Sequence, residues 1–168
     1  MSDPKPPAKP DPVQPADAEA RALARDLLTR SRHGALAWTD PETGTPGISR
    51  IAFGLCPAGG PLTLISGLAP HRAALAAHPD AALMLGEPEA KGDPLTHPRL
   101  MLRVQAEEVP RDAPDHGAIR EHWLETHPKS KIYIDFPDFA FVRLRPRSAL
   151  LNGGFARAFR LTPEDLLP

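Results

Sequence analysis

The chain has 168 residues, of which 41% are hydrophobic and 24% charged, the length and composition of one globular domain with a sizeable core. A formal net charge of −1 excludes a field of one sign that would attract nucleic acid or a membrane surface, and no apolar run reaches the roughly 20 residues of a membrane span. The N-terminus has no apolar signal core and Cys56 is the only cysteine, so we expect a soluble, cytoplasmic protein without a disulfide framework or a thiolate zinc site.

Proline is the unusual component of this sequence. It accounts for 22 of the 168 residues, more than twice the average frequency of about 5%. The first fifteen residues hold an especially dense group, and because proline fixes φ and removes a backbone donor, that stretch favours extended polyproline conformations. We therefore predict residues 1–15 as a disordered tail, 16–162 as the single domain and 163–168 as a C-terminal tail.

The first half of the domain reads as one helix followed by short strands. Asp17 is the predicted N-cap of a helix over 18–32, and Gly34 is the predicted C-capping residue. Three strands follow, separated by turns too short for a crossover helix: 34–40, 47–55 and 61–66. These strands are predicted to form an antiparallel three-stranded meander.

The second half mixes two further helices with longer strands. The alanine-rich run 70–78 predicts a helix, and 112–127 predicts another that carries Trp123. Alternation of apolar and polar side chains in 99–109 is typical of a half-buried strand. The remaining strands are 81–87, 139–146 and 148–153, with 154–161 along an edge. Six or seven short strands with three small helices predict a mainly β, α+β fold, an antiparallel barrel flanked by small helices, since closure removes exposed edges.

Polar side chains gather where the strand 61–66 ends and the next helix begins. If the strands 47–55 and 61–66 pair through the turn between them, Arg50 lies near the same end of the sheet as Ser66. His71 and Arg72 open the following helix, whose free N-terminal amides attract anions, and arginine offers bidentate geometry to a phosphate. This pattern suggests phosphate binding; the alternative is a solvated strand face beside a polar helix start.

Several segments resemble, in order and spacing, the FMN-binding split barrels related to pyridoxamine 5′-phosphate oxidase. The resemblance covers roughly 18–160, and its later segments are most similar to the haem-utilisation, HugZ-like branch. The segments that carry it are GISRIAF (47–53), LISGLAPH (64–71), AAHPDAAL (76–83), GDPLTHPRLMLRVQAEEV (92–109), IYIDFPDFAFVRL (132–144) and NGGFARA (152–158).

The resemblance implies a homodimer of six-stranded split barrels, with FMN held in each of two clefts between the subunits. Ser49 and Arg50 match the strand along the flavin, and NGGFARA matches a loop near the flavin ring. A cation beside the ring is useful because reduced flavin carries negative charge around N1. The cofactor-binding residues implied in this way are Ser49, Arg50, Ser66, His71, Arg72, Phe155 and Arg157.

Three departures from the family pattern narrow the predicted activity. The haem-utilisation branch usually has His-Thr-x-Asn where this chain has His71-Arg72-Ala73-Ala74. The chain ends RLTPEDLLP, without the Arg-Leu-His-x-Arg substrate segment of the true oxidases, so pyridoxal phosphate synthesis is not expected. Haem-degrading members carry a histidine in an extension beyond the barrel, whereas no histidine follows His127 here.

We therefore predict an FMN-binding flavoprotein, a probable oxidoreductase that acts on an unidentified small molecule at the dimer interface. No residue stands out as a dedicated acid or base, so none is named as catalytic. The spacings of the seven histidines do not bring three of them around one ion, and no metal site is predicted. Two alternatives stay open: a haem-binding or haem-utilisation protein on the same barrel, and a non-catalytic dimer that binds a small ligand.

Overall fold

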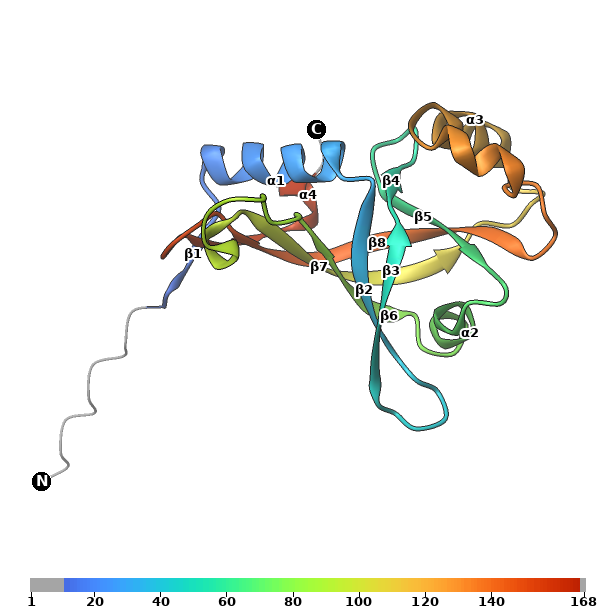
Figure 1. The fold of residues 1–168 in the computed structure, drawn as a ribbon, viewed down its shortest axis with the longest axis horizontal. Coiled ribbons are helices and arrows are strands. Elements are labelled where there is room, and N and C mark those ends of the chain that lie inside the picture. The colour runs from blue at the N-terminus through green and yellow to red at the C-terminus, as the bar shows by residue number, and fades with distance from the viewer. Residues whose placement is uncertain (1–10, 167–168) are drawn as a thin grey trace, which may run out of the picture.

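The computed structural model describes residues 11–166, which form one curled sheet of nine strands with helices against it (Figure 1). The strands are β1 (Val13–Pro15), β2 (His33–Thr39), β3 (Pro46–Ala52), β4 (Gly54–Leu55), β5 (Pro61–Ser66), β6 (Asp80–Leu85), β7 (Arg99–Glu108), β8 (Phe139–Asn152) and β9 (Ala158–Leu161). The α-helices are α1 (Ala18–Arg30), α2 (Pro70–Ala77), α3 (His116–Thr126) and α4 (Pro163–Leu166), and short 3-10 helices occupy Pro94–Thr96 and Pro128–Ile132. None of the helices within residues 11–166 has the length and hydropathy to cross a bilayer.

The barrel is open along one seam, which makes it a split barrel as predicted. Six strands pair antiparallel in the order β3-β2-β6-β7-β8-β5, and β3 and β5 lie beside each other without pairing. A side chain crosses this seam instead: the Thr63 hydroxyl donates to the Ala52 carbonyl oxygen at 2.7 Å. Thr63 is fully buried, so this bond stands in for the missing backbone ladder at that point.

The main core fills the inside of the curled sheet. The predicted alternation in β7 is confirmed, because Leu100, Leu102 and Val104 are buried in it while Arg103 is exposed. Helix α1 packs its buried stripe against this core, and Asp17 caps it by accepting a hydrogen bond from the Ala20 amide at 2.8 Å. A second, smaller cluster lies under α3, built around Trp123.

Three predictions about strand pairing, strand extent and helix capping differ from the structure. Residues 34–66 do not form a simple meander, because β5 pairs with β4 and β8 rather than with β3. The predicted strands 139–146 and 148–153 are one strand, β8, which keeps pairing with β7 across a register shift. Helix α1 is C-capped by Ser31, and Gly34 lies in β2, where an added Cβ would stand 2.8 Å from a Leu85 methyl carbon.

The predicted tails also contain ordered elements. Residues 1–10 of the predicted tail 1–15 lie outside the described residues, but Val13–Pro15 forms β1, parallel to β9. Arg160 fixes this pairing through Asp11 at 2.8 Å and the Val13 carbonyl at 2.9 Å. At the other end, the predicted C-terminal tail contains α4, whose Leu166 is buried in the main core. The proline-rich segment therefore pairs, at its end, with an edge strand that would otherwise expose unpaired backbone groups.

Candidate functional site

The structure brings together two of the predicted phosphate-binding residues, and acidic residues engage both of them. The Ser66 hydroxyl donates to Asp138 Oδ2 at 2.9 Å. The Arg72 guanidinium donates to the Asp138 carbonyl oxygen and, through Nη2, to Glu108 Oε1 at 2.8 Å. A phosphate placed between Ser66 and Arg72 would therefore have to compete with two carboxylates for these donors.

His71 precedes Arg72 in the first turn of α2, half-buried. Its Nδ1 atom is shielded from solvent and has no hydrogen-bond partner among residues 11–166. Burial lowers the pKa of this imidazole below its ordinary value, because the charged form loses hydration there. Burial thus favours the neutral form of the His71 imidazole over the charged form.

Arg50 and Ser49 lie apart from this pair. The Ser49 hydroxyl points to the inner face of β3 and accepts a hydrogen bond from Trp38 Nε1 at 3.1 Å. Arg50 is exposed on the outer face and makes no hydrogen bond or ion pair with the part of the chain that the structure describes. The predicted convergence of Arg50 with Ser66 assumed that their strands pair, and that assumption is wrong.

The last two predicted cofactor residues lie in the turn between β8 and β9, at the opposite end of the long axis from α2 (Figure 1). Phe155 is 88% exposed, and Arg157 is paired with Glu19 at 3.0 Å. One chain thus distributes the seven predicted residues over three separate places. Within a single protomer they do not form one flavin site.

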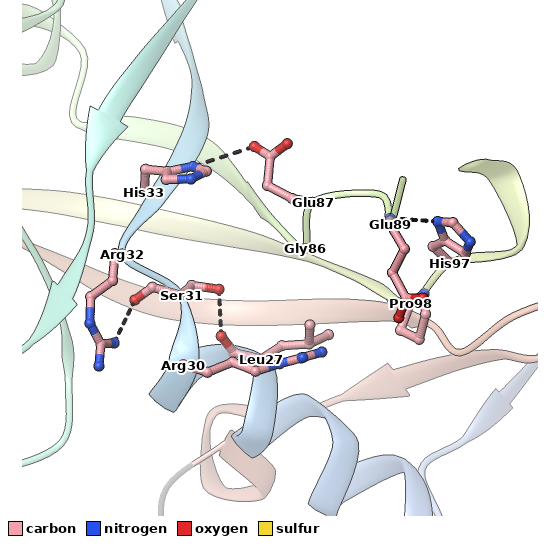
Figure 2. Close-up of a pocket in the computed structure, with 10 residues that line it drawn as sticks. All are labelled: Leu27, Arg30, Ser31, Arg32, His33, Gly86, Glu87, Glu89, His97 and Pro98. Carbon is pink, nitrogen blue, oxygen red and sulfur yellow. Dashed lines mark hydrogen bonds and ion pairs between the residues drawn. The ribbon is translucent and has the colours of Figure 1, made fainter. Parts of the chain in front are cut away.

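A pocket of about 330 Å³ opens at the rim of the barrel, where several titratable side chains meet (Figure 2). We call it the rim pocket. It lies between the end of α1, the start of β2 and the loop that follows β6. Its lining residues are Leu27, Arg30, Ser31, Arg32, His33, Gly86, Glu87, Glu89, His97 and Pro98.

The two histidines of the rim pocket differ in the partners of their Nδ1 atoms. His33 Nδ1 lies 3.3 Å from Glu87 Oε1, close enough for an ion pair when the imidazole is protonated. His97 Nδ1 instead accepts a hydrogen bond from the Glu89 amide at 2.9 Å, so its neutral form carries the proton on Nε2.

Local backbone geometry holds these groups in place. Gly86 turns the chain out of β6 with φ +103°, and an added Cβ would lie 2.5 Å from the Pro98 carbonyl oxygen, so glycine is required there. Ser31 ends α1 by donating its hydroxyl hydrogen to the Leu27 carbonyl at 2.6 Å, which starts β2 in the correct direction. Both features bring His33 and Glu87 to the same edge (Figure 2).

The charge of the rim pocket is mixed. Arg30 is paired with Asp26 at 2.9 Å, with both side chains largely exposed, and the Arg32 guanidinium donates to the Thr29 carbonyl at 2.8 Å. Leu27 and Pro98 add apolar surface. Within residues 11–166 no three histidine, cysteine, aspartate or glutamate side chains converge to hold a bare metal ion. The lining therefore presents charges of both signs to a ligand: two arginines and two glutamates, together with two histidines.

Sequence reasoning did not find this pocket. His33 and Glu87 are far apart in the sequence and meet only because β2 pairs with β6. The readable signal was local: a histidine shortly after a helix end, preceded by basic residues at 30 and 32. That signal does not reveal the carboxylate partner.

Comparisons with known proteins find relatives whose names refer to haem. No family model matches it. It is 30% identical over 136 residues to the chloroplastic heme oxygenase HOZ of Arabidopsis thaliana, covering 80% of this chain and 40% of HOZ. A solved structure of a heme binding protein from Mycobacterium smegmatis is 30% identical with a TM-score of 0.80, over 90% of this chain and 61% of that one. The chain thus spans less than two thirds of the length of both relatives.

Another solved structure matches over nearly its whole length: it is 46% identical, with a TM-score of 0.83, over 92% of this chain and 99% of the other. More distant structures share the fold. Vibrio cholerae HutZ, a heme storage protein, has 22% identity and a TM-score of 0.69, over 84% of this chain and 97% of that one. A Clostridium acetobutylicum protein of the pyridoxinephosphate oxidase family has 14% identity and a TM-score of 0.65, over 90% of this chain and 99% of that one.

Proposed function

Because the chain belongs to the split-barrel family related to pyridoxamine 5′-phosphate oxidase, in its haem-utilisation, HugZ-like branch, we propose that it is a haem-binding protein. The relatives support this alternative better than the FMN-dependent oxidoreductase that the sequence favoured, since the names of HOZ and of the mycobacterial protein both refer to haem. Flavin chemistry is supported only through the wider fold family.

The rim pocket is the observation that carries the proposal. Haem has an apolar macrocycle, two carboxylates and an iron that takes imidazole as an axial ligand. Pro98 offers apolar contact, Arg30 and Arg32 offer charge-assisted hydrogen bonds to carboxylates, and His33 offers an imidazole. When bound, haem would supply an iron centre for storage, transfer or oxygen chemistry.

Flavin fits less well. The donors predicted for its phosphate, Ser66 and Arg72, are bound to Asp138 and Glu108. Arg50, the third predicted donor, lies on another face. Binding FMN there would require Ser66 and Arg72 to leave both acidic partners, which then stand unpaired beside the phosphate.

We also propose that two copies of the chain associate, as the family resemblance implies, through the outer face of the sheet. Paired residues of neighbouring strands point to the same side, and the outer side carries apolar side chains on each of five strands, together with Arg50, Arg103 and Ser148. Ile48 is 76% exposed and Met84 is 46% exposed on it. The outer face consists of two rows: Arg50, Ala35, Met84, Met101 and Leu150, and Ile48, Ala37, Ala82, Arg103 and Ser148.

Titration of the purified full chain with haemin and, separately, with FMN tests the proposed function. We expect an intense Soret band that saturates with haemin and no binding of FMN in the same concentration range. Saturable FMN binding without haemin binding would overturn the proposal in favour of a flavoprotein. A visible region that responds to neither cofactor would leave the non-catalytic ligand-binding dimer.

A pair of charge-reversal substitutions tests whether the rim pocket is the proposed haem site. Arg30→Glu with Arg32→Glu places two carboxylates where haem carboxylates are expected to lie, so haemin affinity falls by about tenfold or more. The matched control reverses two exposed lysines away from the pocket, Lys129→Glu with Lys131→Glu, and leaves the affinity unchanged. Equal losses in both variants would show a general charge effect and refute the rim pocket as the site.

A further inference from the structure

We propose that a second pocket, beside the middle of β8, binds anions that carry two or more phosphate or carboxylate groups. It has a volume of about 440 Å³, within the range of small-molecule sites. Three arginines form one of its walls, Arg143, Arg145 and Arg147, so we call it the arginine pocket. It shares no lining residue with the rim pocket and does not depend on the haem binding proposed above.

The arginines reach one wall through the local structure of β8. Arg143 and Arg145 are two residues apart in the strand, so their side chains point to the same side. Arg147 is the extra residue at the register shift of β8 and has no paired residue in β7. Such an irregularity changes the direction of a side chain, and Arg147 lines the pocket with the other two. Residues two apart in a strand are separated by about 7 Å, which suits a ligand with more than one acidic group.

The opposite wall forms because β5 ends before the arginine row does. The ladder between β5 and β8 stops at the pair Leu62–Arg143, so within residues 11–166 no strand pairs with Arg145 on that side. The turn between β4 and β5 lies there instead, closed by a hydrogen bond from the Cys56 amide to the Gly60 carbonyl oxygen at 2.8 Å. The space between this turn and β8 is the arginine pocket.

The arginine pocket has an excess of positive charge. Each guanidinium has one side-chain partner: Arg143 donates to Asp115, Arg145 to Glu107 and Arg147 to Gln105. Two of these partners are carboxylates and the third is a neutral amide, so Arg147 forms no ion pair within residues 11–166. Arg103 and Asp80 lie farther along the same face and add one charge of each sign, so the excess remains.

The two carboxylate partners leave room for a ligand. The side chains of Asp115 and Glu107 are 56% and 48% exposed, and exposed ion pairs are weak. A guanidinium has five N–H donors, so most of them stay available for charge-assisted bonds to a ligand. The balance is the reverse of that at Arg72, where one cation meets two acidic residues, Glu108 and Asp138.

Cys56 allows a direct test of the location, because it is the only cysteine of the chain and lines the arginine pocket. The rate at which uncharged N-ethylmaleimide alkylates the full chain is measured with pyrophosphate, with citrate and with chloride at equal ionic strength. Calorimetric titration gives the affinity for each anion. At ten times its dissociation constant, pyrophosphate or citrate should slow alkylation about tenfold, because only the free pocket reacts. Chloride should have no such effect.

The comparison of pyrophosphate with citrate identifies the chemistry of the ligand. Tighter binding of pyrophosphate assigns phosphate groups to the ligand, and tighter binding of citrate assigns carboxylates. Either result supports the site when it comes with protection of Cys56. Binding of both anions without protection of Cys56, or binding of neither, would overturn the proposal.

A pair of substitutions tests the arginines themselves. Arg145→Gln with Arg147→Gln removes two exposed cations and should weaken anion binding at least about tenfold and abolish the protection of Cys56. The control, Lys129→Gln with Lys131→Gln, removes the same charge from another exposed segment and should change neither measurement. Equal losses in both double variants would show a general charge effect and refute the site.

Discussion

Arg72 connects helix α2 to the sheet through three side-chain hydrogen bonds. It was predicted as a phosphate donor, but its guanidinium joins α2 to β7 and to the residue just before β8, through Glu108 and the Asp138 carbonyl. Only 22% of the Arg72 side chain is exposed, so its contacts are partly shielded from water. Arg72 therefore links helix α2 to strand β7 and to the start of strand β8.

Replacing this arginine is therefore expected to change stability. Arg72→Ala should lower the free energy of unfolding of the cofactor-free protein by about 1–2 kcal/mol, since it removes hydrogen bonds to a carboxylate and a carbonyl. Arg30→Ala removes an exposed pair within one helix and should cost less than about 0.5 kcal/mol. Urea unfolding of both variants measures the difference; equal costs would contradict the structural role of Arg72.

His71 is expected to make stability depend on pH. Its pKa is lowered by burial, so the unfolded chain binds a proton more readily than the folded chain. The stabilisation is therefore fully present above the ordinary histidine pKa of about 6.5 and declines as pH falls through that value. Between pH 7.5 and pH 5.5 the Tm of the parent should fall further than that of His71→Ala. Parallel declines would show that His71 does not titrate in this way.

The polar cluster was only partly readable at this scale. The sequence correctly suggested that Ser66 and Arg72 share a strand end and a helix start. It did not reveal that Ser66 bonds to Asp138 and Arg72 to Glu108, because these partners come 72 and 36 residues later in the chain. Local pattern identifies donors, but long-range pairing decides whether a donor is free.

At the scale of elements, the seam between β3 and β5 depends on a single buried side-chain hydrogen bond, so a mutation there should lower stability. Thr63→Val keeps side-chain volume but leaves the Ala52 carbonyl oxygen without its donor in a buried place. The expected loss is about 1–3 kcal/mol in the free energy of unfolding. Thr29→Val removes the same kind of bond, from a threonine to the Arg25 carbonyl, on an exposed helix face and should cost less than about 0.5 kcal/mol. Thermal and urea unfolding measure both; similar losses would contradict a special role for the seam.

The elements themselves were predictable where local signals agree. Asp17 and its following stripe specified α1, and alternation specified β7. The pairing of β5 was not predictable, because the short turn between the predicted strands 47–55 and 61–66 favours a hairpin. Only tertiary packing shows that β3 meets β5 through the Thr63–Ala52 hydrogen bond and not through a backbone ladder. Likewise, no local signal shows that Val13–Pro15 adds to the edge at β9.

At the scale of the whole molecule, the outer face connects the barrel to its proposed partner. The rim pocket, at about 330 Å³, is at the lower end of the range for ligand sites. A second copy on the outer face would bury Ile48 and Met84, which a lone chain leaves in water.

Charge placed on the outer face should separate two associated copies. In a two-fold dimer each substitution enters twice, so Ile48→Glu buries two unpaired carboxylates and should raise the dissociation constant by about 100-fold or more. Leu68→Glu, at a residue 90% exposed after β5, is the control and should leave association unchanged. Light scattering after size exclusion should give the parent and Leu68→Glu twice the 18.2 kDa of one chain, and Ile48→Glu the mass of one. A parent of single-chain mass, or an Ile48→Glu variant that stays paired, would remove the outer face as the interface.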